Sequence, residues 1–89
     1  MKSNFEIWLQ GCKINNSEVW CLEGDGDSGL YKVFKRYFVG NREYNETPVY
    51  IGWVNGKQVV AVTNYRQAYT VWHNRMVELE NLENMGGAA

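Results

Sequence analysis

The stretch Val54-Asn55-Gly56-Lys57 decides how the second half of the chain folds, because it places Asn-Gly between two apolar runs, 49–54 and 59–63. Both central residues of a type I′ turn need a positive φ, and Asn-Gly tolerates this best. A segment with helical periodicity begins near Tyr65, directly after the second run. The second half of the chain therefore predicts a strand, a tight turn, a second strand and a helix.

Alternation along this predicted hairpin assigns its side chains to two faces. The face that we expect in the core consists of three cross-strand pairs: Val49 with Val62, Ile51 with Val60, and Trp53 with Gln58. The opposite face is also largely apolar, and we expect another element or a partner to cover it. Its cross-strand pairs are Tyr50 with Ala61, Gly52 with Val59, and Val54 with Lys57.

Thr63 and Asn64 are candidate N-caps of the helix that follows, because their side-chain oxygens can accept hydrogen bonds from free backbone N–H groups. The helix carries one apolar stripe, which we expect to cover the hairpin. The members of the stripe are Tyr65, Ala68, Tyr69, Trp72, Met76 and Leu79.

The first half of the chain predicts another hairpin. Residues 5–9 alternate with a period of two, which is typical of a half-buried strand, and residues 18–23 form a short apolar run. Asn15-Asn16-Ser17 would form the turn between them, and this register places Cys12 opposite Cys21. A disulfide is geometrically conceivable there, but we expect reduced thiols in a cytosolic setting.

The segment 30–39 fits both a helix and a strand. Its content of Tyr, Phe and Val favours a strand, whereas its apolar residues recur with the spacing of an amphipathic helix. We favour the helix, because a strand would place Lys35 and Arg36 on opposite faces in the middle of the run. In the strand alternative, Gly40-Asn41 becomes a further hairpin turn.

The fold class that follows is a small α+β domain. It has an antiparallel sheet of about four strands and a C-terminal helix packed on one face. With the second helix at 30–39 the order of elements is ββαββα.

The length of 89 residues predicts one domain, over residues 1–85, followed by a disordered tail at 86–89. No apolar run approaches the roughly 18 residues of a membrane helix, and the N-terminal residues lack the apolar region of a signal peptide. We therefore expect a cytoplasmic protein that does not contact a membrane.

No motif predicts catalysis, a metal site or a cofactor. The segment 23–29 is rich in acids and glycines, but it lacks the ligand spacing of a calcium loop. The single histidine, His73, belongs to no motif that joins it to a cysteine. We expect a protein that is not an enzyme and that has no cofactor and no metal; a small enzyme built on His73 and a cysteine is a minor alternative.

Aromatic residues carry the leading hypothesis for function. The chain has four Trp and six Tyr, and four Trp alone exceed what a core of this size easily hides. Exposed aromatics are typical of binding surfaces. We expect a small protein-binding module of the inhibitor or adaptor type; phage-encoded anti-defence or host-takeover proteins have this size and composition. The expected anchors are Trp8, Trp20, Tyr31 and Tyr50, with Asp25 and Asp27 as a charged rim.

The alternative function is nucleic-acid binding through the segment 31–42. Its basic residues are Lys32, Lys35, Arg36 and Arg42, which could contact phosphates. The net charge of −1 gives no general attraction to nucleic acid. A homodimer is a further possibility, through the second face of the hairpin or through an unpaired sheet edge.

Overall fold

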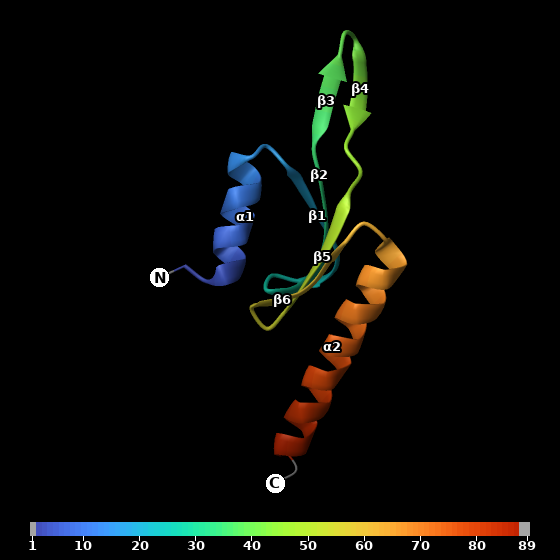
Figure 1. The fold of residues 1–89 in the computed structure, drawn as a ribbon. Coiled ribbons are helices and arrows are strands. Elements are labelled where there is room, and N and C mark those ends of the chain that lie inside the picture. Colours follow the sequence, from blue (N-terminus) through green and yellow to red (C-terminus); the bar gives the residue numbers. More distant parts are fainter. Residues whose placement is uncertain (1, 88–89) are drawn as a thin grey trace.

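Two helices and six strands make up residues 2–87, which are the residues that the computed structural model describes; side chains are described for residues 2–82 (Figure 1). In chain order the elements are α1 (Asn4–Ile14), β1 (Glu18–Asp25), β2 (Ser28–Phe34), β3 (Arg36–Val39), β4 (Arg42–Asn45), β5 (Val49–Val54), β6 (Lys57–Val62) and α2 (Tyr65–Gly87).

Four strands form one antiparallel sheet in the order β1-β2-β5-β6, and the other two pair only with each other. Strand β3 follows β2 after one residue, and β4 leads back into β5. The central hairpin of the sheet is therefore extended by a two-stranded ribbon, residues 36–45, which we call the arm. Figure 1 shows the arm projecting beyond the sheet, away from the C-terminal half of α2. The α+β class and the four-stranded antiparallel sheet with a C-terminal helix are confirmed.

The N-terminal helix α1 shows that the predicted strand at residues 5–9 is wrong. The Oγ atom of Ser3 caps the helix by accepting a hydrogen bond from the backbone N–H of Glu6 (3.2 Å). Phe5 and Trp8 both pack against the sheet, whereas Ile7 is 56% exposed. The side chains that pack on the sheet are thus three residues apart, as in a helix, and not two residues apart, as in a strand.

The predicted turn at residues 15–17 is instead the C-terminal end of α1. The backbone N–H of Asn16 donates to the carbonyl of Lys13 (3.1 Å), and Asn16 has a positive φ of 59°. Cys12 therefore lies on a helix and Cys21 on β1, so that the predicted register between them is wrong. Both thiols are free.

The helix favoured for residues 30–39 is also wrong, and the strand alternative is confirmed. Strand β2 is an inner strand, and it pairs with β1 on one side and with β5 on the other. Its backbone groups are satisfied by these neighbours, which outweighs the helical spacing of its side chains. Lys35 lies between β2 and β3, so that it and Arg36 are exposed beyond the end of the sheet. Gly40 and Asn41 form the turn at the tip of the arm.

The segment 23–29 is the end of the β1–β2 hairpin: residues 23–25 belong to β1, residues 28–29 belong to β2, and Gly26 and Asp27 form the tight turn. Asp25 lies opposite Ser28, and Gly26 has a φ of 51°. Two hydrogen bonds join this end of the hairpin to the β5–β6 turn: Gly56 N–H donates to the carbonyl of Asp27 (3.0 Å), and Asn55 N–H donates to Oγ of Ser28 (2.9 Å).

The predicted hairpin and helix of the second half are confirmed. Asn55 and Gly56 both have a positive φ, 50° and 79°, as a type I′ turn requires. Asn64 caps α2, because its Oδ1 accepts a hydrogen bond from the backbone N–H of Gln67 (2.9 Å). Thr63 does not have this role.

The predicted register of this hairpin holds only near its turn. Trp53 lies opposite Gln58, as predicted. A β-bulge between Gly52 and Trp53 then shifts the pairing by one residue. The predicted pairs Val49 with Val62 and Ile51 with Val60 are therefore wrong; the observed pairs are Tyr50 with Val62, Ile51 with Ala61 and Gly52 with Val60.

Helix α2 covers the face of the sheet that carries Gly52 and Leu30. Ala68 and Trp72 of the helix and Leu30 and Val54 of the sheet are buried together. Trp72 also donates a hydrogen bond from Nε1 to the carbonyl of Trp53 (3.1 Å). The rest of the stripe is partly buried except at its start, where Tyr65 is 43% exposed. The prediction that this stripe covers the hairpin is confirmed.

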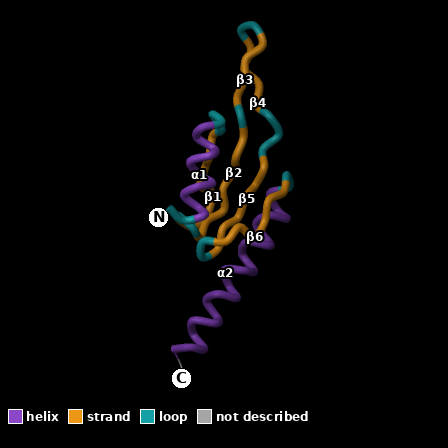
Figure 2. The backbone as a smooth tube through the Cα atoms, turned by 60° about the vertical axis from the view of Figure 1, so that its left-hand side comes forward, coloured by secondary structure: helices purple, strands orange, loops and turns teal. Residues whose placement is uncertain are grey.

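Helix α1 covers the opposite face, so that the sheet has a helix on each side (Figure 2). Phe5 and Trp8 of α1 pack on Tyr31 and Trp53, with all four ring-centroid distances between 5.5 and 5.6 Å. Tyr31 and Trp53 neighbour Leu30 and Gly52 in sequence, and alternation therefore sends them to the other side.

Helix α2 runs beyond the sheet to Gly87, past the first residue of the predicted tail at 86–89. Ala88 and Ala89 lie outside the described residues. Within residues 2–87, neither helix combines the length and the apolar character needed to cross a membrane.

The closest approach between helix and sheet gives a test of this packing. A Cβ atom at Gly52 would lie 2.7 Å from Cγ1 of Val60 and 3.1 Å from Cβ of Trp72. We expect Gly52→Ala to lower the free energy of unfolding by about 1–3 kcal/mol, because the site has no room for a methyl group. Urea denaturation measures the change.

Gly11→Ala is the matched control, because a Cβ atom at this position of α1 would have no neighbour within 4 Å. This substitution should raise the free energy of unfolding by about 0.5–1 kcal/mol through helix propensity. Equal effects of the two substitutions would contradict the close contact between Trp72 and β5.

Candidate functional site

A hollow opens at the base of the arm, on the side of the sheet that α2 covers. Helix α2 packs mainly over β5 and β6 and reaches β2 near Leu30, whereas the end of β1 and β2 next to the arm, at Trp20 and Lys32, is left open on this face. The hollow has a volume of about 310 Å³. We call it the arm-base hollow, and its lining residues are Trp20, Lys32, Phe34, Arg36, Glu43, Asn45, Glu46 and Pro48.

Two aromatic rings form the floor of this hollow. Trp20 lies opposite Lys32 across β1 and β2, and Phe34 is two residues farther along β2, so that all three side chains share one face. The rings of Trp20 and Phe34 are 5.3 Å apart and nearly perpendicular. Trp20 is 47% exposed, whereas Phe34 is buried. The accessible part of the floor is therefore an indole ring held in place by a buried phenyl ring.

Lys32 places a positive charge above this floor. Its Nζ atom lies 5.3 Å from the ring centroids of both Trp20 and Phe34, within the range of a cation–π interaction. Among the described side chains Lys32 forms no ion pair. Its ammonium group thus remains able to bind a carboxylate from outside.

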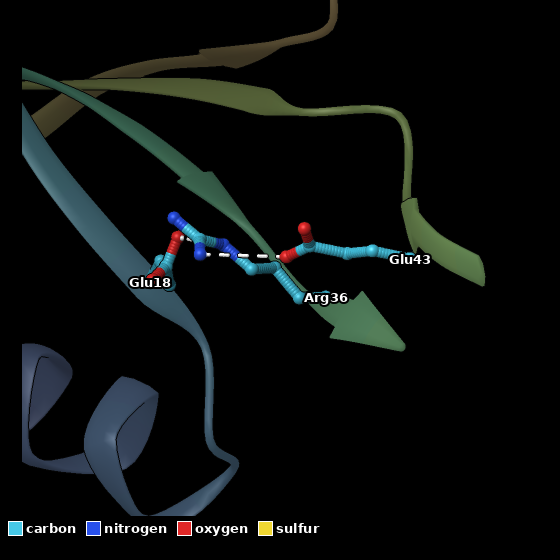
Figure 3. A network of polar contacts seen from close by, with 3 residues as sticks. All are labelled: Glu18, Arg36 and Glu43. Atoms are coloured by element: carbon cyan, nitrogen blue, oxygen red, sulfur yellow. Dashed lines mark hydrogen bonds and ion pairs between the residues drawn. The ribbon is translucent and has the colours of Figure 1, made fainter. Parts of the chain in front are cut away.

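Arg36 joins the sheet to the arm through two carboxylates (Figure 3). Its Nε atom is 2.8 Å from Oε2 of Glu18 on β1, and its Nη1 atom is 3.4 Å from Oε1 of Glu43 on β4. The Glu18 oxygen accepts no well-directed hydrogen bond, so that charge attraction alone holds this contact. Ion pairs as exposed as these contribute about 0–1 kcal/mol. Their main effect is to orient the arm and to neutralise Arg36.

The arm itself has two different faces, because cross-strand partners share a face. Arg36, Glu43 and Asn45 line the arm-base hollow, and Phe38 lies on the same face of the arm. The other face, which we call the tyrosine face, consists of Tyr37, Val39, Arg42 and Tyr44. Phe38 is 69% exposed and Val39 is 61% exposed. Both faces of the arm therefore present apolar surface to solvent.

The residues predicted to bind a protein do not form one surface. Trp20 lies in the arm-base hollow, but Tyr31 is 6% exposed and belongs to the core, as does most of Trp8. Tyr50 packs edge-on against Tyr65 of α2. The exposed residues Asp25 and Asp27 lie at the β1–β2 turn, at the end of the sheet opposite to the arm. Of the four predicted aromatic anchors, Trp20 is the only one with an exposed side chain.

The basic residues of the alternative prediction do come together along the arm and its base. Lys32 and Arg36 line the arm-base hollow, Arg42 lies on the tyrosine face, and Lys35 is exposed between them. However, Arg36 is paired with two glutamates, and Glu46 borders the same hollow. The charge of this region is therefore mixed rather than strongly positive.

The structure does not join His73 to a cysteine. His73 lies on α2 and stacks on Tyr69, with ring centroids 5.5 Å apart. Cys12 lies on α1, on the other side of the sheet, and Cys21 pairs with Tyr31, whose side chain faces α1. Among the described residues, no group of three His, Cys, Asp or Glu side chains is placed to bind a metal ion.

Sequence reasoning missed the arm. Of the aromatic residues that the arm exposes, Tyr37 and Phe38 fall in the segment 30–39, for which we favour a helix, and Tyr44 falls in a segment for which no strand is predicted. The available signal was Gly40-Asn41 between two short runs, which predicts a hairpin only once the strand alternative is chosen.

The chain matches no protein-family model, no curated protein and no solved structure.

Tyr31 connects the α1 side of the core to the β1–β2 turn. Its hydroxyl donates a hydrogen bond to the carbonyl of Gly26 (2.6 Å). Burial raises the pKa of Tyr31 to about 12, and the neighbouring Cys21, Asp25 and Asp27 act in the same direction. The phenol is thus held in its neutral form as a hydrogen-bond donor.

This raised pKa predicts a loss of stability in alkaline solution. Above about pH 10 the phenol of Tyr31 ionises in the unfolded chain but stays protonated in the fold, so that the free energy of unfolding falls as the pH rises toward 12. Tyr31→Phe should lack this part of the dependence, and Tyr44→Phe should retain it. Urea denaturation at pH 9 and pH 11 measures both; an unchanged pH dependence in Tyr31→Phe would refute the role of this phenol.

Proposed function

We propose that this protein is a small non-enzymatic protein-binding module, of the inhibitor or adaptor type, and that the arm-base hollow is its contact site. The observation that carries the proposal is the indole ring of Trp20, which is fixed by Phe34 yet half exposed at the floor of a hollow. Trp, Tyr and Arg dominate the energetics of protein interfaces, and they do so when they sit in pockets that a partner can seal from water.

The chemistry around Trp20 indicates the kind of segment that fits. An apolar side chain of the partner would lie on the indole ring and against Pro48, and a neighbouring carboxylate would meet the ammonium group of Lys32. Phe38, which projects from the arm on the same side, would extend the apolar contact. Arg36 and Glu43 would form a polar rim that fixes the register.

A protein that acts through this hollow would inhibit or connect its partners by binding alone, without a chemical reaction. The charged residues that line the hollow are lysine, arginine and glutamate, and Arg36 is already held by two carboxylates. An anti-defence or host-takeover inhibitor of phage origin would act in this way, by covering a surface of its target.

Nucleic-acid binding is the alternative, and the gathering of Lys32, Lys35, Arg36 and Arg42 along the arm supports it. We rank it lower, because Glu18, Glu43 and Glu46 lie among these cations and would repel phosphates.

The proposal predicts that Trp20→Ala removes binding of the partner. The experiment is affinity capture from the native host with the wild-type protein, followed by measurement of the affinity for the captured protein. The loss of a central tryptophan anchor should weaken binding by at least about 2 kcal/mol. Circular dichroism checks that the fold is retained.

Tyr65→Ala is the matched control, since Tyr65 is a similarly exposed aromatic residue (43%) at the start of α2, and it lies outside the hollow. Equal affinities for the wild-type protein and Trp20→Ala would refute the site. Capture of nucleic acid alone, lost in Arg42→Ala and retained in Trp20→Ala, would establish the alternative.

A further inference from the structure

The tyrosine face of the arm is apolar, exposed and without a covering element. Tyr37 and Tyr44 stack across the two strands, with ring centroids 5.5 Å apart and planes 20° from parallel. Tyr37 is 46% exposed, Tyr44 39% and Val39 61%. A two-stranded ribbon without such cover is only marginally stable in water. The arm is thus a ribbon whose apolar face needs an occupant.

We propose that this occupant is the tyrosine face of a second copy of the chain, which forms a symmetric dimer of antiparallel arms. The proposal differs from the function proposed above, because its apolar centre, Tyr37, Val39 and Tyr44, lies on the face of the arm that points away from the arm-base hollow. Glu46, at the base of the arm, borders the hollow as well. Closed two-fold pairing requires a surface that is complementary to itself, and the tyrosine face has this property.

The self-complementarity follows from the order of residues along the arm. If the two arms pack face to face and run in opposite directions, the Tyr37–Tyr44 pair of each copy lies at the two-fold axis. The tip of one arm then lies over the base of the other. At the base of each arm the backbone N–H of Glu46 donates a hydrogen bond to the carbonyl of Lys35 (2.9 Å), so that Glu46 follows Tyr44 in the alternation of the strand. In the proposed dimer Arg42, at the tip of one arm, would face Glu46 at the base of the other.

This arrangement places opposite charges, Arg42 of one copy and Glu46 of the other, next to each other at both ends of the contact. Within the described residues Arg42 has no ion pair in its own chain. The symmetric contact would provide two such pairs, one at each end of a central apolar cluster. Val39 of each copy would lie over Lys35 of the other, whose aliphatic stem can cover an apolar side chain.

The area available is at the lower limit of a specific interface. With aromatic side chains burying about 150–250 Å² each, the exposed parts of Tyr37, Val39 and Tyr44 amount to roughly 300 Å² in each copy. Two copies, together with Arg42, Lys35 and the ribbon backbone, reach roughly 1,000 Å², which a specific contact needs. The dimer should therefore be weak, with a dissociation constant in the micromolar range.

Sedimentation equilibrium over a range of concentrations up to about 1 mM tests the proposal. The wild-type protein should show a monomer–dimer equilibrium. Val39→Lys should weaken the dimer at least about tenfold, because the new cation would face Lys35 of the second copy. Ile14→Lys is the matched control, since Ile14 is similarly exposed (71%) at the end of α1, and it should leave the equilibrium unchanged.

A charge exchange tests the orientation of the arms. Arg42→Glu and Glu46→Arg should each weaken the dimer, and the double variant should restore it, because the pair then has the reverse polarity. Failure of the double variant to recover would overturn the antiparallel arrangement.

A protein that stays monomeric at every concentration would overturn the dimer itself, as would a dimer that Val39→Lys leaves unchanged. Neither result would affect the function proposed for the arm-base hollow, which is tested by Trp20→Ala.

Discussion

The contact of Trp72 with the backbone at Gly52 is the constraint on which the rest of the structure depends. Because Gly52 has no side chain, the indole ring of Trp72 approaches β5 closely enough to donate a hydrogen bond to the carbonyl of Trp53. Trp53 points to the other face, where it meets Phe5 and Trp8 of α1. Two consecutive residues of one inner strand thus hold both helices. The bulge at this position also sets the register in which Val60 and Val62 pack toward α2.

The candidate site exists because this packing covers only part of the sheet. The two helices cover the inner strands β2 and β5 on opposite faces. Beyond the helices the chain continues from β2 into β3 and returns through β4 to β5, and this uncovered part is the arm. At the boundary, Phe34 is the last buried residue of β2 and supports Trp20, while Arg36 is the first residue of β3 and binds Glu18 and Glu43. The arm-base hollow is therefore a consequence of where the layered structure ends.

Local turn chemistry could be read from the sequence, and the choice between helix and strand often could not. Asn55-Gly56 and the cap at Asn64 act through their own backbone and side-chain groups, and both predictions are confirmed. Residues 30–39 fit two periodicities, and residues 5–9 alternate like a strand although they belong to a helix. Contacts with distant segments decide them, through Tyr31 and Trp53 for α1 and through the flanking strands for β2.

The site was predictable to a smaller extent, for the same reason. Trp20 can be identified from its residue type, because large aromatic side chains are enriched where proteins bind one another. Phe34 and Arg36 line the hollow together with Trp20, and they belong to a segment whose register depends on pairing with β5. The spacing of these residues in the sequence therefore does not predict that they lie beside Trp20. The surface position predicted for Tyr31 is wrong, because the layer formed by α1 covers it and the sequence pattern does not predict that layer.

The most direct test of this architecture is the set of nuclear Overhauser effects from the tryptophan side chains in solution. The indole protons of Trp72 should show contacts with Leu30 and Gly52, and those of Trp8 should show contacts with Tyr31 and Trp53. Contacts of Trp8 with α2, or helical sequential contacts between the amides of residues 30–34, would contradict a sheet held between two helices.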